Sequence, residues 1–192
     1  MKIKALQKLV NDCINITLLT EPGRQQIMVA NAIYPLDGFP ALDESTLLAV
    51  MDVPTEERKE KTVQISMADT LRGYLDDNQD ADAQARRTQL EIKVNGAVLF
   101  PLYSPYGMLA VSEEIVKPIN DCKEAVWFVR KVSGHPVIIV KNGFQRIATF
   151  IPCMDWARNE VCECLNDLAD GAVRMNQEMH ERVPDNDSYG SV

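Results

Sequence analysis

The segment Ala125–Ile151, AVWFVRKVSGHPVIIVKNGFQRIATFI, predicts three consecutive strands joined by two tight turns. Val137–Val140 is entirely apolar, and the flanking stretches are rich in β-branched and aromatic residues, which favour strands. Ser133-Gly134 and Asn142-Gly143 supply the turn residues between them. This C-terminal meander is the least ambiguous structure in the chain and predicts a sheet on which the other elements pack.

The same signals upstream predict more strands, for a total of about eight. Five strands are expected upstream of the meander. Four of them form two hairpins around Pro-Gly and Asn-Gly turns, Ile14–Leu19 with Gln26–Tyr34 and Leu90–Val94 with Ala97–Phe100. The fifth, Thr62–Met67, alternates apolar and polar residues. Apolar residues at helical spacing predict several short helices and one longer helix over Met154–Arg182.

The expected fold is therefore α+β: a mostly antiparallel sheet built from hairpins and a C-terminal meander, short helices packed on it, and one longer C-terminal helix. Residues 1–183 are expected to form a single α+β domain. A subdivision is possible within residues 76–88, where DDNQDADAQARR reads as an exposed linker or a frayed helix start. The tail over residues 184–192, PDNDSYGSV, is expected to be disordered.

Composition excludes several classes of function. The net charge is −8, and from Met154 onward nine acidic residues stand against three arginines. Such a chain is repelled by phosphate, which argues against binding to nucleic acid or to an anionic membrane. No apolar run approaches the roughly 20 residues of a membrane span, and no signal peptide is apparent. Five irregularly spaced cysteines predict reduced thiols, so a soluble protein of the cytoplasm is expected.

No motif predicts a metal site, a cofactor or a catalytic residue. Two cysteines two apart on a helix, Cys162 and Cys164, diverge too far to share one metal ion. The acidic alternation after Asp76 resembles half a calcium loop but has Ala81 in place of the turn glycine and Arg87 in place of the final glutamate. His135, in a turn, has no cysteine signature nearby, and phosphate-loop and GxSxG motifs are absent from the sequence. Whether the protein is an enzyme is left undecided, with a non-enzymatic interpretation favoured.

Two aromatic loops form the first candidate site. Residues 34–40 (YPLDGFP) and 100–107 (FPLYSPYG) share an aromatic-Pro-Leu pattern after a strand, which is either a duplicated unit or a coincidence of a common pattern. Prolines stiffen both loops, so their aromatic side chains could anchor a ligand or partner at low entropic cost. The hypothesis is a groove lined by Tyr34, Phe39, Tyr103 and Tyr106, with packing in the core as the alternative.

The predicted C-terminal helix forms the second candidate site, with a stripe of apolar residues that includes Leu165, Leu168, Met175 and Met179. The stripe either covers the chain's own meander or pairs with another chain. The favoured function is therefore a cytoplasmic, non-enzymatic protein-interaction or self-associating module, whose partner is another protein or a second copy in a homodimer. The alternative is a small-molecule-binding protein or enzyme that uses the groove between the two aromatic loops.

Overall fold

The computed structural model describes residues 1–77, 80–94 and 96–153. The chain divides into two units, Met1–Cys153 and Met154–Val192, and the described residues all belong to the first. The longer C-terminal helix and the tail expected from the sequence lie outside the described residues. No helix in the described part of the chain is both long and apolar enough to cross a membrane.

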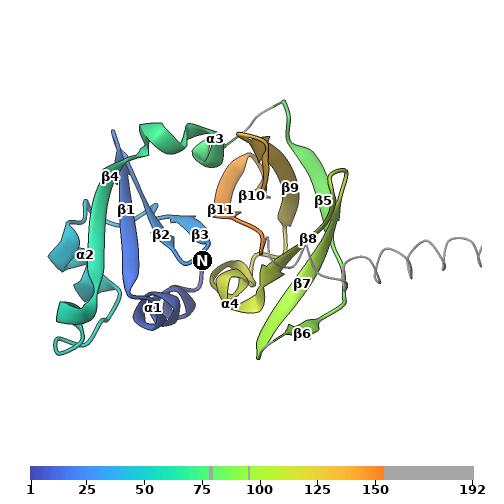
Figure 1. The fold of residues 1–192 in the computed structure, drawn as a ribbon. Helices are drawn as coiled ribbons and strands as arrows, with labels where there is room; N and C mark the ends of the chain where they lie inside the picture. The colour runs from blue at the N-terminus through green and yellow to red at the C-terminus, as the bar shows by residue number, and fades with distance from the viewer. Residues whose placement is uncertain (78–79, 95, 154–192) are drawn as a thin grey trace, which may run out of the picture. The chain divides into compact units, whose positions relative to one another are not determined.

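A mixed sheet of eleven strands dominates the described residues, in the order β4-β1-β2-β3-β11-β10-β9-β5-β7-β6, with β8 also paired to β7 (Figure 1). Neighbouring strands run antiparallel, except that β4 runs parallel to β1. The strands are β1 (Asn15–Glu21), β2 (Arg24–Val29), β3 (Ala32–Pro35), β4 (Thr62–Met67), β5 (Ala83–Arg87), β6 (Ile92–Val94), β7 (Ala97–Ser104), β8 (Gly107–Ser112), β9 (Ala125–Val132), β10 (His135–Asn142) and β11 (Gln145–Phe150).

Four short α-helices and three single 3₁₀ turns complete the described residues. They are α1 (Ile3–Asp12), α2 (Glu44–Val50), α3 (Arg72–Leu75), α4 (Glu113–Val116), η1 (Arg58–Glu60), η2 (Ala68–Leu71) and η3 (Lys117–Ile119). The Asp43 carboxylate caps α2 by accepting the backbone N–H of Thr46 at 2.8 Å. This hydrogen bond is the main reason why the pKa of Asp43 falls to about 2.

The predicted meander is confirmed. β9, β10 and β11 follow one another as antiparallel neighbours, with Ile138 opposite Val129 on one side and opposite Phe150 on the other. Ser133 and Gly134, both with positive φ, make the first turn. The meander lies in the middle of the sheet because β11 also pairs with β3, and β9 also pairs with β5.

The α+β prediction is wrong, because the described residues are mostly β. Three strands were missed. Gln26–Tyr34 is two strands rather than one, because Ala30, with φ of 50°, turns the chain between β2 and β3. The polar stretch after Asp76 contains β5, which is stabilised by pairing with β9 and β7 rather than by its own composition. The sheet is mixed, because it also contains one parallel pair: α2 lies in a long crossover that brings β4 beside β1 in parallel.

The loop predicted over residues 100–107 is instead the hairpin of β7 and β8, and this is the third missed strand. Pro101 sits inside β7 at the place where the neighbouring strand changes from β6 to β5. The backbone N–H of Thr88 donates to the Pro101 carbonyl there, at 3.0 Å. The nitrogen of Pro101 points to the same side as its carbonyl, toward the junction between β6 and β5. Its lack of an N–H therefore removes no hydrogen bond between strands, and β7 tolerates the proline. The two aromatic-Pro-Leu segments consequently occupy different structural settings.

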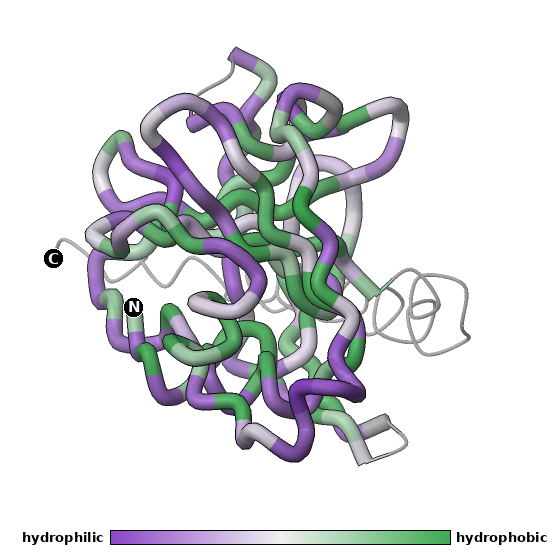
Figure 2. The backbone as a smooth tube through the Cα atoms, turned by 90° about the vertical axis from the view of Figure 1, so that its left-hand side faces the viewer, coloured by the Kyte–Doolittle hydropathy of each residue, from purple (hydrophilic) through white to green (hydrophobic). Residues whose placement is uncertain are grey.

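The main core lies on one face of the curved sheet, with α1 and α4 between the sheet's two ends (Figure 1). It joins residues of both halves of the chain, among them Leu6, Leu18, Tyr34, Leu102 and Phe150. Hydrophobic stretches accordingly concentrate in the middle of the unit (Figure 2). The second face carries a smaller apolar cluster of Leu19, Ile33, Ala68 and Leu75, where η2 and α3 pack on the strands.

Candidate interaction site

The structure separates the four aromatic residues of the predicted groove. Tyr34 is completely buried in the main core, where its hydroxyl donates to the Ile115 carbonyl and its ring meets Phe150 edge-on, with 6.1 Å between centroids. Burial raises the pKa of Tyr34 well above its ordinary value. Phe39 is half-buried against the same core and lines a surface cavity of about 470 Å³ with Arg24 and Asp37.

Tyr103 and Tyr106 lie elsewhere, in and just after β7. Tyr103 is 65% exposed and lines a different, shallow hollow with Arg86 and Pro105. Tyr106 is 40% exposed, and the Lys131 ammonium lies 4.8 Å from its ring centroid. Four strands separate β3 from β7 in the sheet order. The structure therefore keeps Tyr103 and Tyr106 near each other but does not bring Tyr34 or Phe39 to them.

The structure describes only some of the other residues that the sequence singled out. Leu165, Leu168, Met175 and Met179 lie outside the described residues, so the partner-helix hypothesis stays a prediction. His135 is exposed at the start of β10. Among the described residues no group of three or more His, Cys, Asp or Glu side chains could hold a metal ion.

The second face of the sheet carries a buried polar cluster that the sequence did not predict. Asp82 binds the Arg130 guanidinium through both carboxylate oxygens, at 2.6 and 2.9 Å, and also accepts from Lys141 at 2.6 Å. All three side chains are buried, and the Gly73 carbonyl accepts a further hydrogen bond from Arg130. One carboxylate therefore ties β9 and β10 to the chain just before β5.

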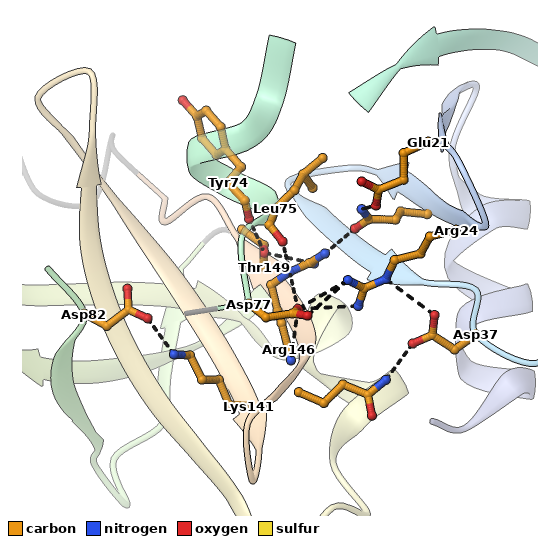
Figure 3. Close-up of polar contacts among 12 residues, drawn as sticks. Glu21, Arg24, Asp37, Tyr74, Leu75, Asp77, Asp82, Lys141, Arg146 and Thr149 are labelled. Atoms are coloured by element: carbon orange, nitrogen blue, oxygen red, sulfur yellow. Dashed lines mark hydrogen bonds and ion pairs between the residues drawn. The ribbon is translucent and has the colours of Figure 1, made fainter. Parts of the chain in front are cut away.

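Arg146 forms the other half of this cluster (Figure 3). Its buried guanidinium donates to the Leu75 carbonyl at 3.0 Å, to the Thr149 hydroxyl at 3.3 Å, and to the side-chain oxygen of Gln26. Burial is the main reason why the pKa of Arg146 falls to about 10, so the group is still a cation at neutral pH. These contacts fasten α3 to β11 and β2.

Arg24 completes the network at the protein surface. Its guanidinium lies between Asp77, at 3.3 Å, and Asp37, at 3.5 Å, and Asp37 also accepts from Gln145 at 2.8 Å (Figure 3). The cavities beside it, of about 470 and 340 Å³, are thus lined by charges that already have partners. In the described part of the chain, only Asn11 Oδ1 is a buried side-chain polar atom without a hydrogen bond. The cluster fastens the strands together and presents no activated nucleophile.

The open edge of the sheet is β4, at the left end in Figure 1. Its sequence, TVQISM, contains neither a charge nor a proline. The Thr62 N–H donates to the Ile14 carbonyl at 2.9 Å, so the backbone of Thr62 points toward β1. Because backbone groups alternate in direction along a strand, those of Val63 and Ile65 point away from the sheet. No described strand pairs with that edge.

Two large apolar side chains stand exposed on this edge strand. Ile65 is 56% exposed and Met67 60% exposed, and the half-buried Val63 packs against the main core on the same side. Opposite Leu18 of β1, Ile65 continues the core-facing row of side chains beyond the end of the core. β4 therefore presents a row of apolar side chains beside open backbone groups.

The opposite end of the sheet is protected. The outward carbonyl of Ala110 in β8 accepts the Cys153 N–H at 3.0 Å, and Leu109 to Val111 are buried. β6 has only three residues, and Lys93 stands in its centre. Short length, charge and cover are the usual means by which proteins block pairing at a sheet edge. β4 has six residues and no charge, and although α2 packs against it, no strand or backbone hydrogen bond of the described residues occupies its outer edge, which makes it the candidate interaction site.

A scan against protein-family models and searches of curated proteins and of solved structures each found no match to this chain. Any function must therefore be inferred from the surfaces and contacts of the chain itself.

Proposed function

We propose that the protein is a cytoplasmic, non-enzymatic interaction module that self-associates by pairing β4 of one copy with β4 of a second copy. The observation that carries this proposal is the open, uncharged edge of β4 with Ile65 and Met67 exposed beside it. An exposed apolar edge strand is a template for the addition of another strand.

The pattern of β4 favours a second copy as the partner. In an antiparallel pair with a two-fold axis at Ile65, Ile65 faces its own counterpart and Val63 faces Met67 of the other chain. Directly opposite side chains lie on the same face of a sheet, so the apolar row meets the same row of the second copy. A two-fold interface requires such self-complementarity. The open backbone groups of Val63 and Ile65 would form the hydrogen bonds between the two chains.

Other properties support the remaining parts of the proposal. The polar groups of the cluster around Arg146 bind one another, which fits a structural role rather than a catalytic one. Cys13 and Cys122 form no disulfide with another described residue, as expected in a reducing compartment. An edge of only six residues buries little area, so the dimer should be weak and dependent on protein concentration.

Replacing Ile65 by Lys should abolish the dimer. Two lysines would face each other at the two-fold axis, and like charges directly opposite one another destabilise strand pairing. Sedimentation velocity over a range of concentrations should show reversible dimerisation of the wild type and a monomer for Ile65→Lys. The melting temperature of the monomer should hardly change, because Ile65 is exposed.

A matched control is Leu90→Lys, which places the same charge at a residue that is 53% exposed but lies outside β4. It should dimerise like the wild type. Deleting residues 171–192 tests the competing partner-helix hypothesis: a β4 dimer keeps its association constant, whereas a helix-mediated dimer is lost. A wild type that stays monomeric at high concentration, or an Ile65→Lys variant that still dimerises, would refute the proposal.

A further inference from the structure

Three side chains on β5, β7 and β8 form a continuous strip on one face of the sheet, here called the basic-aromatic strip. Arg86 lies directly opposite Tyr103, and Tyr103 lies directly opposite Met108. Directly opposite residues share a face and lie close enough to act together. The strip therefore places a guanidinium, a phenol ring and a thioether side by side across three strands.

Arg86 is exposed and has no ion pair or hydrogen-bonded partner among the described residues. Its neighbour Arg87 is different: it lies on the opposite face, 3.9 Å above the centre of the Phe100 ring, and contacts Asn120. β5, β7 and β8 contain these two arginines and no acidic residue. The strip therefore carries a single positive charge, that of Arg86, in a chain whose net charge is −8.

The strip borders a wide, shallow hollow of about 700 Å³, which is lined by Gln84, Ala85, Arg86, Tyr103 and Pro105. The turn beside it is held in place by Ser104, whose hydroxyl donates to the Gly107 carbonyl at 2.8 Å and accepts the Tyr106 N–H at 3.2 Å. A fixed turn keeps Tyr103 and Pro105 in position before anything binds. Preorganised aromatic and arginine side chains are the residues that contribute most to protein interfaces.

We propose that the basic-aromatic strip docks an acidic segment of a partner protein that also carries an apolar side chain. A carboxylate of the segment would bind the Arg86 guanidinium through paired hydrogen bonds, and the apolar side chain would cover Tyr103 and Met108. This goes beyond the proposed self-association, because β4 and the strip lie on strands near opposite ends of the sheet order. The two surfaces can be tested separately.

The charge distribution selects a peptide rather than a nucleic acid. A nucleic-acid site neutralises several phosphates with a run of basic side chains. The strip offers one exposed arginine, and the rest of the chain is acidic. A carboxylate beside an apolar group therefore complements one arginine and its apolar neighbours better than a string of phosphates does.

The test is fluorescence anisotropy with three labelled probes: a twelve-residue peptide of alternating aspartate and leucine, the same peptide with lysine for aspartate, and a twelve-nucleotide oligothymidylate. The aspartate peptide should bind the wild type, and the lysine peptide and the oligonucleotide should not. Arg86→Glu and Tyr103→Ala should each weaken binding of the aspartate peptide by at least about tenfold. Both residues are exposed, so both variants should fold, which their melting temperatures report.

Arg72→Glu is the matched control, because Arg72 is an exposed arginine of α3 that already pairs with Asp69. It should bind the aspartate peptide as the wild type does. The proposal is overturned if the aspartate peptide does not bind, if Arg86→Glu and Arg72→Glu have equal effects, or if the oligonucleotide binds more tightly and responds to Arg86→Glu. An Ile65→Lys protein that binds the peptide normally would separate this site from the β4 interface.

Discussion

Replacement of Asp82 by Asn should lower the free energy of unfolding by about 3–5 kcal/mol, the usual cost of removing one partner from a buried ion pair. The carboxylate of Asp82 is shared by Arg130 and Lys141, and all three side chains are almost completely removed from water. An amide in its place would leave the Arg130 guanidinium buried without a countercharge. Urea denaturation should show the loss directly, and the melting temperature should fall by on the order of 10 °C.

Asp69→Asn is the control for this substitution, since it removes an equal charge from an ion pair at the surface. Asp69 contacts Arg72 at 3.2 Å, but its side chain is 71% exposed. Exposed pairs contribute little, so this variant should stay within about 0.5 kcal/mol of the wild type. Equal stabilities for Asp82→Asn and Asp69→Asn would contradict the burial of the Asp82 cluster.

The second large effect is expected from a pair of tyrosine substitutions. Tyr34→Ala should cost about 3–5 kcal/mol, because it opens a cavity beside Phe150 and leaves the Ile115 carbonyl without its donor. Tyr103→Ala removes the same atoms from an exposed position and should change stability by about 0.5 kcal/mol or less. Thermal and urea denaturation of the two variants, measured side by side, check both values.

The two tyrosine substitutions also distinguish the predicted aromatic groove from its alternative, packing in the core. A groove lined by both would make both substitutions mild and would affect ligand binding alike. The structure instead assigns Tyr34 to the core and Tyr103 to the surface. Comparable losses of stability in the two variants would contradict that assignment.

Strand positions could be predicted from the sequence where local signals are strong. The meander of β9, β10 and β11 has apolar strands and glycine turns, and it forms as expected. β5 could not be predicted, because its residues AQARR have no strand pattern and depend on neighbours that are distant in the sequence. The parallel pairing of β1 with β4 could not be predicted either, because it is set by a crossover rather than by the residues of either strand.

The sequence does contain an indication of the buried charges, although patterns of neighbouring residues give it little weight. Arg130 and Lys141 each sit within or directly beside a run of apolar residues in a strand that the sequence predicts to be buried. A charge in that setting requires a partner, because burial of an unpaired charge is costly. The partner, Asp82, lies in a polar stretch that resembles an exposed linker, so composition alone places it in water. Only the fold brings the three together.

The central position of the meander has a consequence for synthesis of the chain on the ribosome. β3 and β5 belong to the same sheet only through β11, β10 and β9, which lie between them. Until residues 125–150 have emerged, the strands β1 to β4 and the strands β5 to β8 are separate parts of the sheet, with unpaired edges at β3 and β5. The nascent chain therefore completes its sheet from the middle, and a chain shortened before Ala125 would expose two internal edges for pairing with other chains.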